Sequence, residues 1–150
     1  MAAYTLTAEV DRPYAETVAL VRTALVEQGF GVLTEIDLAA TLEDKLGVEL
    51  PPQVILGACR PPLAYAALQA DPSIAAVLPC NVVVRSTGES TSSVEAFDPA
   101  AMMSLADNAA LDEVAADAGR RIGAMLASLG VGQPTPSASA QTNSSSRARS

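Results

Sequence analysis

The sequence predicts an α+β fold, and three observations support that prediction. Residues 4–10 and 30–38 alternate between apolar and polar side chains, which is typical of strands with one buried face. Residues 14–25 and 111–129 instead space their apolar side chains three and four positions apart, as amphipathic helices do. Near the middle of the chain, the turn-like string STGEST separates two strand-like runs. Such a hairpin favours a mixed or antiparallel sheet over a doubly wound parallel one.

The first half of the chain is predicted to alternate strands with helices. Gly29 is placed to end the first helix, and Gly47 is placed to end a second, short helix, because glycine readily adopts the left-handed conformation that follows a last helical turn. In the strand over residues 30–38, regular alternation puts Val32 and Ile36 on the same face. That face is expected to be buried against the helices.

The second half supplies three more strands and two more helical regions. The strands are predicted over residues 53–59, 81–85 and 92–97. Proline is tolerated in the first turn of a helix, so Pro61, Pro62 and Pro99 mark two helix starts. Asp107 is expected to cap a further start inside the last helical region, which would then bend. The predicted order is β-α-β-α-β-α-β-β-α.

The chain is predicted to form one domain over residues 1–130 and a disordered tail over residues 131–150. A chain of 150 residues is long enough for one domain with its own core. Aromatic residues make up only 3%, so Val, Leu, Ile and Ala must build that core. From Gly132 onward the Ser/Ala-rich sequence has almost nothing large to bury, which predicts disorder.

Charge and composition exclude several functional classes. The net charge is −8, and the first 130 residues carry 7 − 17 = −10. Such an acidic protein is not expected to bind nucleic acid or an anionic membrane surface, because both require clustered basic residues. Histidine is absent, which excludes His-dependent nucleophile systems and His-ligated metal sites. The start of the chain has no signal-peptide pattern, so we expect a cytoplasmic protein with reduced thiols.

Sequence motifs for cofactors are also missing. No glycine-rich loop matches the phosphate-binding or dinucleotide-binding patterns, and no nucleophile-elbow pattern appears. The two cysteines, Cys59 and Cys80, are too far apart in sequence for a C-x-x-C redox motif. We therefore expect no cofactor, and the sequence leaves open whether the protein is an enzyme.

Six residues stand out as candidate functional residues. They are Asp37, Lys45, Cys59, Arg60, Cys80 and Asn81. Cys59 ends one buried strand just before a helix start, and Cys80 begins another strand, so the thiols lie close together if these strand ends are neighbours. A helix N-terminus and the Arg60 guanidinium would favour the thiolate form of Cys59. Lys45 is the only lysine of the chain and follows the acidic strand end at Asp37.

Several rare strings occur in an order that is similar to that of the domain of unknown function 302 family. They are KLG, ILGAC, PP and LPCN, within a resemblance from about Tyr4 to Met103. The family positions matched are Lys45, Gly57, Cys59, Pro61, Pro62, Pro79, Cys80 and Asn81. The chain departs at Arg60, where the family usually has asparagine, so a role for a small neutral amide does not carry over. The resemblance implies a curved antiparallel sheet with helices on one side, like the saddle-like fold of the TATA-binding protein, and a homodimer.

Two main hypotheses for function remain open. In the first, the chain is a small-ligand-binding or partner-binding module without catalysis, and the cysteines are packed as small hydrophobic residues. In the alternative, it is a thiol-dependent protein that uses Cys59 and Cys80 for redox chemistry, sulfur transfer or metal handling. A third interpretation is a structural dimer that bridges other proteins through its tail. The expected partners are a second copy and either a small molecule or another protein.

Overall fold

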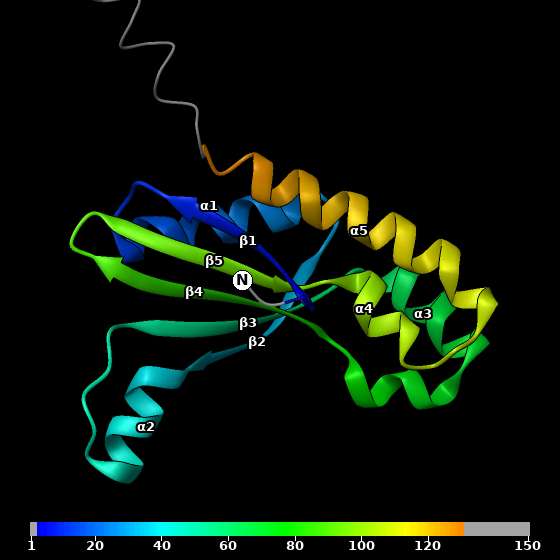
Figure 1. Ribbon diagram of the computed structural model, residues 1–150, viewed down its shortest axis with the longest axis horizontal. Coiled ribbons are helices and arrows are strands. Elements are labelled where there is room, and N and C mark those ends of the chain that lie inside the picture. The colour runs from blue at the N-terminus through cyan, green and yellow to red at the C-terminus, as the bar shows by residue number, and fades with distance from the viewer. Residues whose placement is uncertain (1–2, 131–150) are drawn as a thin grey trace, which may run out of the picture.

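The computed structural model describes residues 3–130 and contains a five-stranded sheet with helices packed against it (Figure 1). The strands are β1 (Thr5–Val10), β2 (Gly31–Asp37), β3 (Gln53–Cys59), β4 (Cys80–Gly88) and β5 (Thr91–Phe97). Their spatial order is β1-β5-β4-β3-β2, and every neighbouring pair is antiparallel. The predicted α+β fold with a mainly antiparallel sheet is therefore confirmed.

The helices occupy three places around this sheet. Their bounds are α1 (Tyr14–Glu27), α2 (Leu38–Leu46), α3 (Pro61–Ala70), α4 (Pro99–Ser104) and α5 (Asp112–Ala127), with short 3-10 helices η1 (Pro72–Val77) and η2 (Ala109–Leu111). Helices α1 and α5 pack on one face of the sheet. Helices α3 and α4 gather beyond one end of the sheet, and α2 stands apart near the opposite end of β2 and β3 (Figure 1).

The main hydrophobic core, called the sheet core here, lies between the sheet and the helices α1 and α5. Val82 and Val84 on β4 and Val94 on β5 are fully buried, and they meet Leu25 of α1 and Ile122 of α5. Burying one such aliphatic side chain contributes about 1.5–3 kcal/mol. The core is built almost wholly from aliphatic residues, as the scarcity of aromatic residues predicted.

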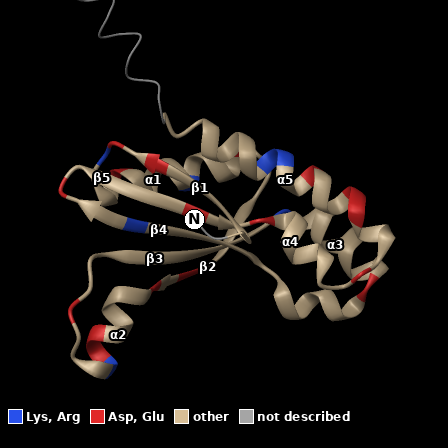
Figure 2. Cartoon of the chain, in the orientation of Figure 1, with Lys and Arg blue, Asp and Glu red and all other residues tan. Residues whose placement is uncertain are grey.

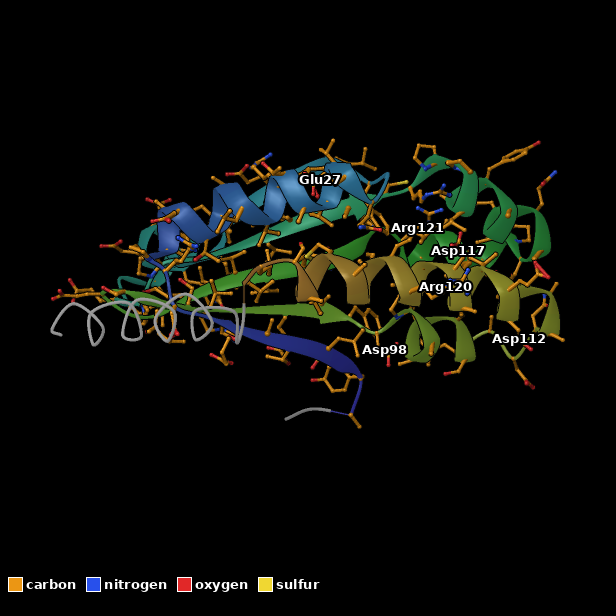
Figure 3. All side chains as sticks on the ribbon, turned by 90° about the horizontal axis from the view of Figure 1, so that it is seen from above. Glu27, Asp98, Asp112, Asp117, Arg120 and Arg121 are labelled. Atoms are coloured by element: carbon orange, nitrogen blue, oxygen red, sulfur yellow. The ribbon has the colours of Figure 1, made fainter. Side chains whose placement is uncertain are left out.

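A second, smaller core, called the helical cluster here, lies beyond the end of the sheet. Its buried members are Ala67, Ile74, Met102, Met103, Leu111 and Val114. Helix α5 joins the two cores, because Val114 in its first turn packs into the helical cluster, whereas Ile122 and Met125 pack into the sheet core. Figure 3 shows α5 running along both parts of the molecule, with Arg121 near the end of α1.

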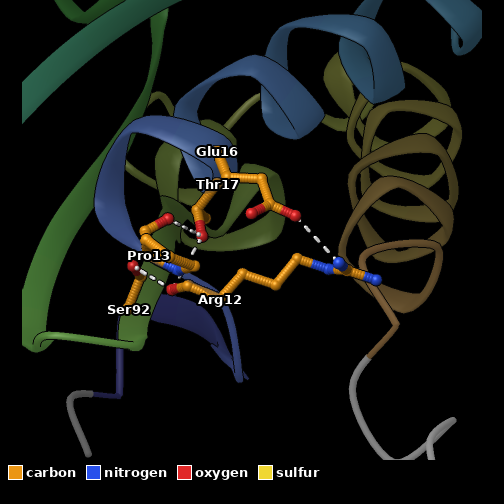
Figure 4. Close-up of polar contacts among 5 residues, drawn as sticks. All are labelled: Arg12, Pro13, Glu16, Thr17 and Ser92. Carbon is orange, nitrogen blue, oxygen red and sulfur yellow. Dashed lines mark hydrogen bonds and ion pairs between the residues drawn. The ribbon is translucent and has the colours of Figure 1, made fainter.

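Buried polar contacts fix the connection between β1 and α1 (Figure 4). The Thr17 hydroxyl lies 2.9 Å from the carbonyl oxygen of Pro13 and 3.3 Å from that of Arg12. The Ser92 hydroxyl donates to the same Arg12 carbonyl at 2.9 Å, and the Arg12 side chain pairs with Glu16 at the surface. Thr17 and Ser92 are fully buried, so leaving either hydroxyl unpaired would cost about 1–3 kcal/mol. These bonds therefore hold the start of α1 against β5.

The prediction for the second strand was wrong about which residues share a face. The register of β2 against β3 shifts just after Val32, because Leu33 is an extra residue without a partner. Val32 pairs with Ala58 on the face covered by helices, whereas Ile36 lies on the opposite face and is 46% exposed. One inserted residue reverses the alternation of side chains beyond it. Val32 and Ile36 therefore point to opposite faces.

The last helical region bends as expected, but its second start has a different cap. The Asn108 side chain accepts a hydrogen bond from the backbone N–H of Ala110 at 2.9 Å, so Asn108 caps η2. Asp107, the predicted cap, instead adopts a left-handed turn with φ 48°. Among residues 3–130, no helix combines the length and the apolar character that crossing a membrane requires. The predicted tail over residues 131–150 lies outside the described residues.

Candidate functional site

A small cavity lies where the sheet core meets the helical cluster, and its volume is about 40 Å³. Residues from the sheet side include Phe30, Ala58, Cys59, Cys80 and Ile122, and those from the helical side include Leu63, Ala64, Ala67, Met102, Met103 and Val114. All but three of the lining residues are aliphatic, aromatic or methionine. The exceptions are Cys59, Arg60 and Cys80. The structure thus brings three of the six candidate residues to one place.

The strand register explains why these residues meet. Ala58 pairs with Cys80, so the last residues of β3 and the first residues of β4 are neighbours, which the sequence had left open. The chain leaves β3 at Arg60 to form α3, and it enters β4 through the cis Leu78–Pro79 peptide. Two short consecutive segments, 58–60 and 78–80, therefore form one wall of the cavity.

Cys80 joins the two hydrophobic cores and packs against members of both. Its thiol lies 3.6 Å from the carbonyl oxygen of Phe97, to which it donates a weak hydrogen bond. Burial raises the pKa of the Cys80 thiol to about 12, and the negative charge of Asp98 adds to that increase. Cys80 is therefore protonated at neutral pH, and a protonated thiol is a poor nucleophile and a poor metal ligand.

Cys59 lies at the same end of the sheet as Cys80 but faces the opposite side of the sheet. It pairs with Gly31 of β2, while its neighbour Ala58 pairs with Cys80. Successive residues of a strand point to opposite faces, so Cys59 and Cys80 point away from each other although their strands are adjacent. Both cysteines are free; neither residue is completely buried, but the Cys80 thiol is enclosed by the two cores closely enough to raise its pKa. A disulfide requires two side chains that point toward each other, so this arrangement does not favour a disulfide between Cys59 and Cys80.

Arg60 is the one charged residue that lines the cavity, and its Nε is fully buried without a hydrogen-bond partner among residues 3–130. The Arg60 side chain packs directly against Gly29. A Cβ atom at Gly29 would lie only 2.9 Å from Nε of Arg60. Seven basic residues occur in the described part of the chain, and five of them form ion pairs. Arg60 and Lys45 are the two that form none there.

The backbone at the start of α3 provides no free donor to the cavity. Pro61 and Pro62 have no backbone N–H, and the N–H groups of Leu63 and Ala64 both donate to the carbonyl oxygen of Arg60 at 3.0 Å. Helix α3 itself carries no charged residue, and Figure 2 shows it in tan along its length. The backbone at this helix start is therefore not suited to bind an anion.

Gly57 provides room for one wall of the cavity. A Cβ at this position would lie 2.9 Å from Cγ of Pro79 and would overlap Oγ1 of Thr34. The absence of a side chain lets the Pro79 ring lie close to the sheet directly before Cys80. Because Pro79 lines the cavity, Gly57 helps to set the cavity's shape.

The other three candidate residues lie elsewhere. Asn81 is exposed on the open face of the sheet, where it lines a shallow groove of about 280 Å³ with Glu95 and Phe97. Asp37 caps α2, because its side chain accepts a hydrogen bond from the N–H of Ala40 at 2.9 Å. Lys45 lies in the last turn of α2. The six candidate residues thus lie in three separate places: the cavity, the open face of the sheet and α2.

Sequence reasoning missed most of the apolar lining. Phe30 directly follows Gly29, and Met102 and Met103 belong to α4, far from β3 and β4 in sequence. No local pattern connects these segments, and only the consecutive methionines hinted at an adaptable apolar surface. Within residues 3–130, no group of three or more acidic or cysteine side chains could hold a metal ion.

Comparison with known proteins identifies relatives but no activity. A family model described as "Domain of unknown function DUF302" matches residues 6–129. The crystal structure of an uncharacterized conserved protein DUF302 from Bacillus stearothermophilus is similar, with 30% sequence identity and a TM-score of 0.76. That match covers 83% of this chain and 97% of the other chain. No curated protein matches the chain.

Proposed function

We propose that this chain, which belongs to the family described as Domain of unknown function DUF302, binds a small, largely apolar ligand in the cavity beside Cys80. The observation that carries the proposal is the cavity's composition, an apolar lining with one charged residue. Ligand sites are typically apolar concavities with a few polar groups that orient the ligand. A volume of about 40 Å³ holds roughly three water-sized groups, or a chain of about three carbon atoms.

The position of the cavity supports ligand binding rather than incomplete packing. It lies between two cores that α5 connects, so a ligand can contact both at once. Met102 and Met103 contribute unbranched side chains, which rearrange more easily than branched ones. A bound ligand would therefore stabilise the helical cluster against the sheet.

Butan-1-ol is a suitable probe for this proposal, because three of its carbon atoms match the cavity's size and its CH2OH end can remain at the opening. We expect the full-length, ¹⁵N-labelled protein to show saturable chemical-shift changes for residues around the cavity, such as Ala58, Ala67 and Ile122. Ala64→Leu places a larger side chain at the lining and should abolish the changes. Ala66→Leu, on the exposed side of the same helix, is the matched control and should preserve them. Equal responses of both variants, or shift changes that do not saturate, would refute the proposal.

The thiol-dependent alternative has weaker support. Cys80, with a pKa of about 12, is a thiol and not a thiolate at neutral pH, and the two side chains point to opposite faces. A thiol mechanism would therefore depend on Cys59 alone. The arrangement favours the hypothesis that Cys80 acts as a packed hydrophobic residue.

A second proposal concerns the homodimer, and it rests on exposed apolar residues around α2. Ile36, Leu46, Val48 and Leu50, called the α2 patch here, are between 42% and 69% exposed. Helix α2 buries none of its residues in the described chain. Contiguous apolar residues at a surface commonly mark an interface. We propose that a second copy of this chain covers the α2 patch.

Charge favours a second copy as the occupant. Lys45 on α2 has acidic neighbours, Glu43 and Asp44, and none of the three forms an ion pair within residues 3–130 (Figure 2). A two-fold symmetric contact brings the same surface of both copies together. Two α2 helices that cross in antiparallel orientation at their last turns would then place each lysine opposite the acidic residues of the other copy.

Analytical ultracentrifugation over a range of protein concentrations tests this dimer. We expect the wild-type chain to sediment as a dimer and Leu46→Asp to sediment as a monomer, because the substitution places a charge in the α2 patch. Leu105→Asp changes a residue that is equally exposed, at 70%, but lies outside the patch. It should remain dimeric. A monomeric wild-type protein, or a dimer that Leu46→Asp leaves intact, would contradict the proposal.

A further inference from the structure

We infer that the groove on the open face of the sheet is a docking site for an arginine side chain, and that its occupant is the C-terminal segment of this chain, which carries Arg147 and Arg149. The inference is independent of the cavity and of the α2 patch. It is supported by the chemistry of the groove, by the distribution of charge along the chain and by the position of α5 on the sheet.

The groove combines a carboxylate with aromatic rings. Tyr4 is 61% exposed, and its ring meets the Phe97 ring edge to face, with the two centroids 6.3 Å apart. A guanidinium can stack on an aromatic ring while it donates hydrogen bonds to a neighbouring carboxylate. This composition therefore fits arginine better than an anion or a hydrocarbon. The residues that line the groove are Tyr4, Thr5, Asn81, Val83, Glu95 and Phe97.

The carboxylate of Glu95 can accept a further hydrogen bond. Oγ1 of Thr5 donates to its Oε2 at 2.7 Å, and this bond lowers the pKa of Glu95, so the group is ionised at neutral pH. Its Oε1 has only a long contact with Nη1 of Arg85, at 3.4 Å. Arg85 is held more closely by Gln53, whose side-chain oxygen accepts from Nε at 2.6 Å. Because the Glu95 side chain is 24% exposed, an incoming guanidinium can make a shorter bond to Oε1.

The C-terminal segment carries the complementary charge. Residues 1–130 have a net charge of −10, whereas Arg147 and Arg149 are the only charged residues of the segment 131–150, which lies outside the described residues. An acidic domain attracts a basic segment over distances longer than a hydrogen bond. The same field repels anions, so a basic occupant is favoured over an acidic one.

The groove is within reach of this segment. Helix α5 contacts β1, the edge strand that borders the groove, and the described chain ends at Gly130 just after this helix. Arg147 is 17 residues beyond Gly130, and a chain of that length spans up to roughly 55–60 Å when extended. The longest strand, β4, has nine residues and is only about 30 Å long. Tethering also gives an effective concentration on the order of 1 mM, so a shallow site of weak affinity can be occupied.

General attraction between the arginines and the acidic surface is the competing explanation. It predicts that lysine replaces arginine without loss and that no single carboxylate matters. Docking in the groove predicts that lysine is a poorer occupant, because it lacks the planar fork and stacks less well, and that Glu95 is required. Glu9 provides a matched control, since it is exposed on the same open face but does not line the groove.

The first experiment compares ¹⁵N–¹H correlation spectra of the full-length wild-type protein and the double variant Arg147→Ser, Arg149→Ser. Both substitutions lie outside residues 3–130, so they leave the contacts of the fold in place. We expect the two spectra to differ at the backbone amides of Asn81, Val83 and Phe97. The lysine variant Arg147→Lys, Arg149→Lys should give only part of the wild-type shifts. No difference at these amides between the wild-type protein and the serine variant overturns the inference.

The second experiment identifies the acceptor and the source of the arginine. Glu95→Gln should abolish the difference between the wild-type and serine-substituted segments, and Glu9→Gln should preserve it. Arginine methyl ester, used as a free probe, should bind the serine variant at least about twofold more tightly than the wild-type protein, because the segment then no longer competes for the groove. Full retention of the difference by Glu95→Gln, full replacement by lysine, or equal binding of the probe would each overturn the inference. Differences that grow with protein concentration would assign the arginines to a second copy and would also overturn it.

Discussion

Replacing Gly57 by alanine tests how the strand ends shape the cavity. The new Cβ would lie 2.9 Å from Cγ of Pro79 and would overlap Oγ1 of Thr34. The Thr34 side chain can rotate away, but the Pro79 ring cannot, so the strand ends must separate slightly. Overpacking of this kind costs about 1–3 kcal/mol. For a domain of this size we expect the melting temperature to fall by roughly 4 °C for each kcal/mol.

The assay is urea unfolding at a fixed protein concentration, followed by the butan-1-ol titration. Gly57→Ala should lower the free energy of unfolding and weaken butan-1-ol binding, because Pro79 lines the cavity. The double variant Gly57→Ala, Thr34→Ala should recover part of the stability. The remaining loss of about 1 kcal/mol would come from the close contact between the new Cβ and Pro79. Gly123→Ala is the matched control: this helical position has nothing within 4 Å of a new Cβ, so stability should rise by about 0.5–1 kcal/mol. If both glycine variants change stability in the same direction, the reasoning is refuted.

The thiols, the buried Ser92 hydroxyl and the partly buried Glu95 carboxylate each lead to a further prediction. Iodoacetamide should modify Cys59 in the native protein but Cys80 only after unfolding. Mass spectrometry of the digested protein identifies the modified residue. Rapid labelling of Cys80 in the native protein would instead support the thiol hypothesis. Ser92→Ala should lower the free energy of unfolding by about 1–2 kcal/mol, since a buried carbonyl oxygen loses a donor, and urea unfolding measures the loss. The hydrogen bond from Thr5 lowers the pKa of Glu95 in the folded state. The ionised Glu95 carboxylate therefore stabilises the fold fully above its unfolded pKa of about 4.3, and this contribution is lost as the pH falls through the lower folded pKa. Unfolding measured between neutral and acidic pH should therefore show a smaller acid-dependent loss for Glu95→Gln than for the wild-type protein, and an identical loss in both would contradict this assignment.

The sequence predicted the elements of the fold well, because each is marked by local chemistry. Pro61 and Pro99 begin helices, and the left-handed Gly47 follows the end of another, as their backbone preferences require. The family expected from the rare strings is also confirmed. The face of Ile36 was predicted wrongly, because a one-residue bulge leaves no mark in the composition of a strand. The assignment of Asp107 as a cap failed because Asn108, one residue later, can form the same hydrogen bond.

The candidate site was predictable only in part, and the reason is again geometric. The sequence left open whether the strand ends that carry Cys59 and Cys80 are neighbours, and the register shows that they are. Alternation along β4 also implies that Cys80 and Asn81 point to opposite faces, so the sequence held enough information to separate them. The cavity itself depends on contacts of α4 and α5 with α3 across the helical cluster. Such long-range contacts have no local sequence signal.

The position of Cys80 explains why we propose a ligand site rather than a thiol enzyme. Cys80 packs against both cores, and this position requires burial. The same burial raises the pKa of its thiol to about 12, which keeps the side chain neutral and allows it to line an apolar cavity. A thiolate there would need a nearby positive charge or greater solvent exposure, but the charged neighbour that acts on Cys80 is Asp98, which disfavours the thiolate. Arg60 lines the same cavity and makes no ion pair within residues 3–130, but it is not among the groups that shift the pKa of Cys80.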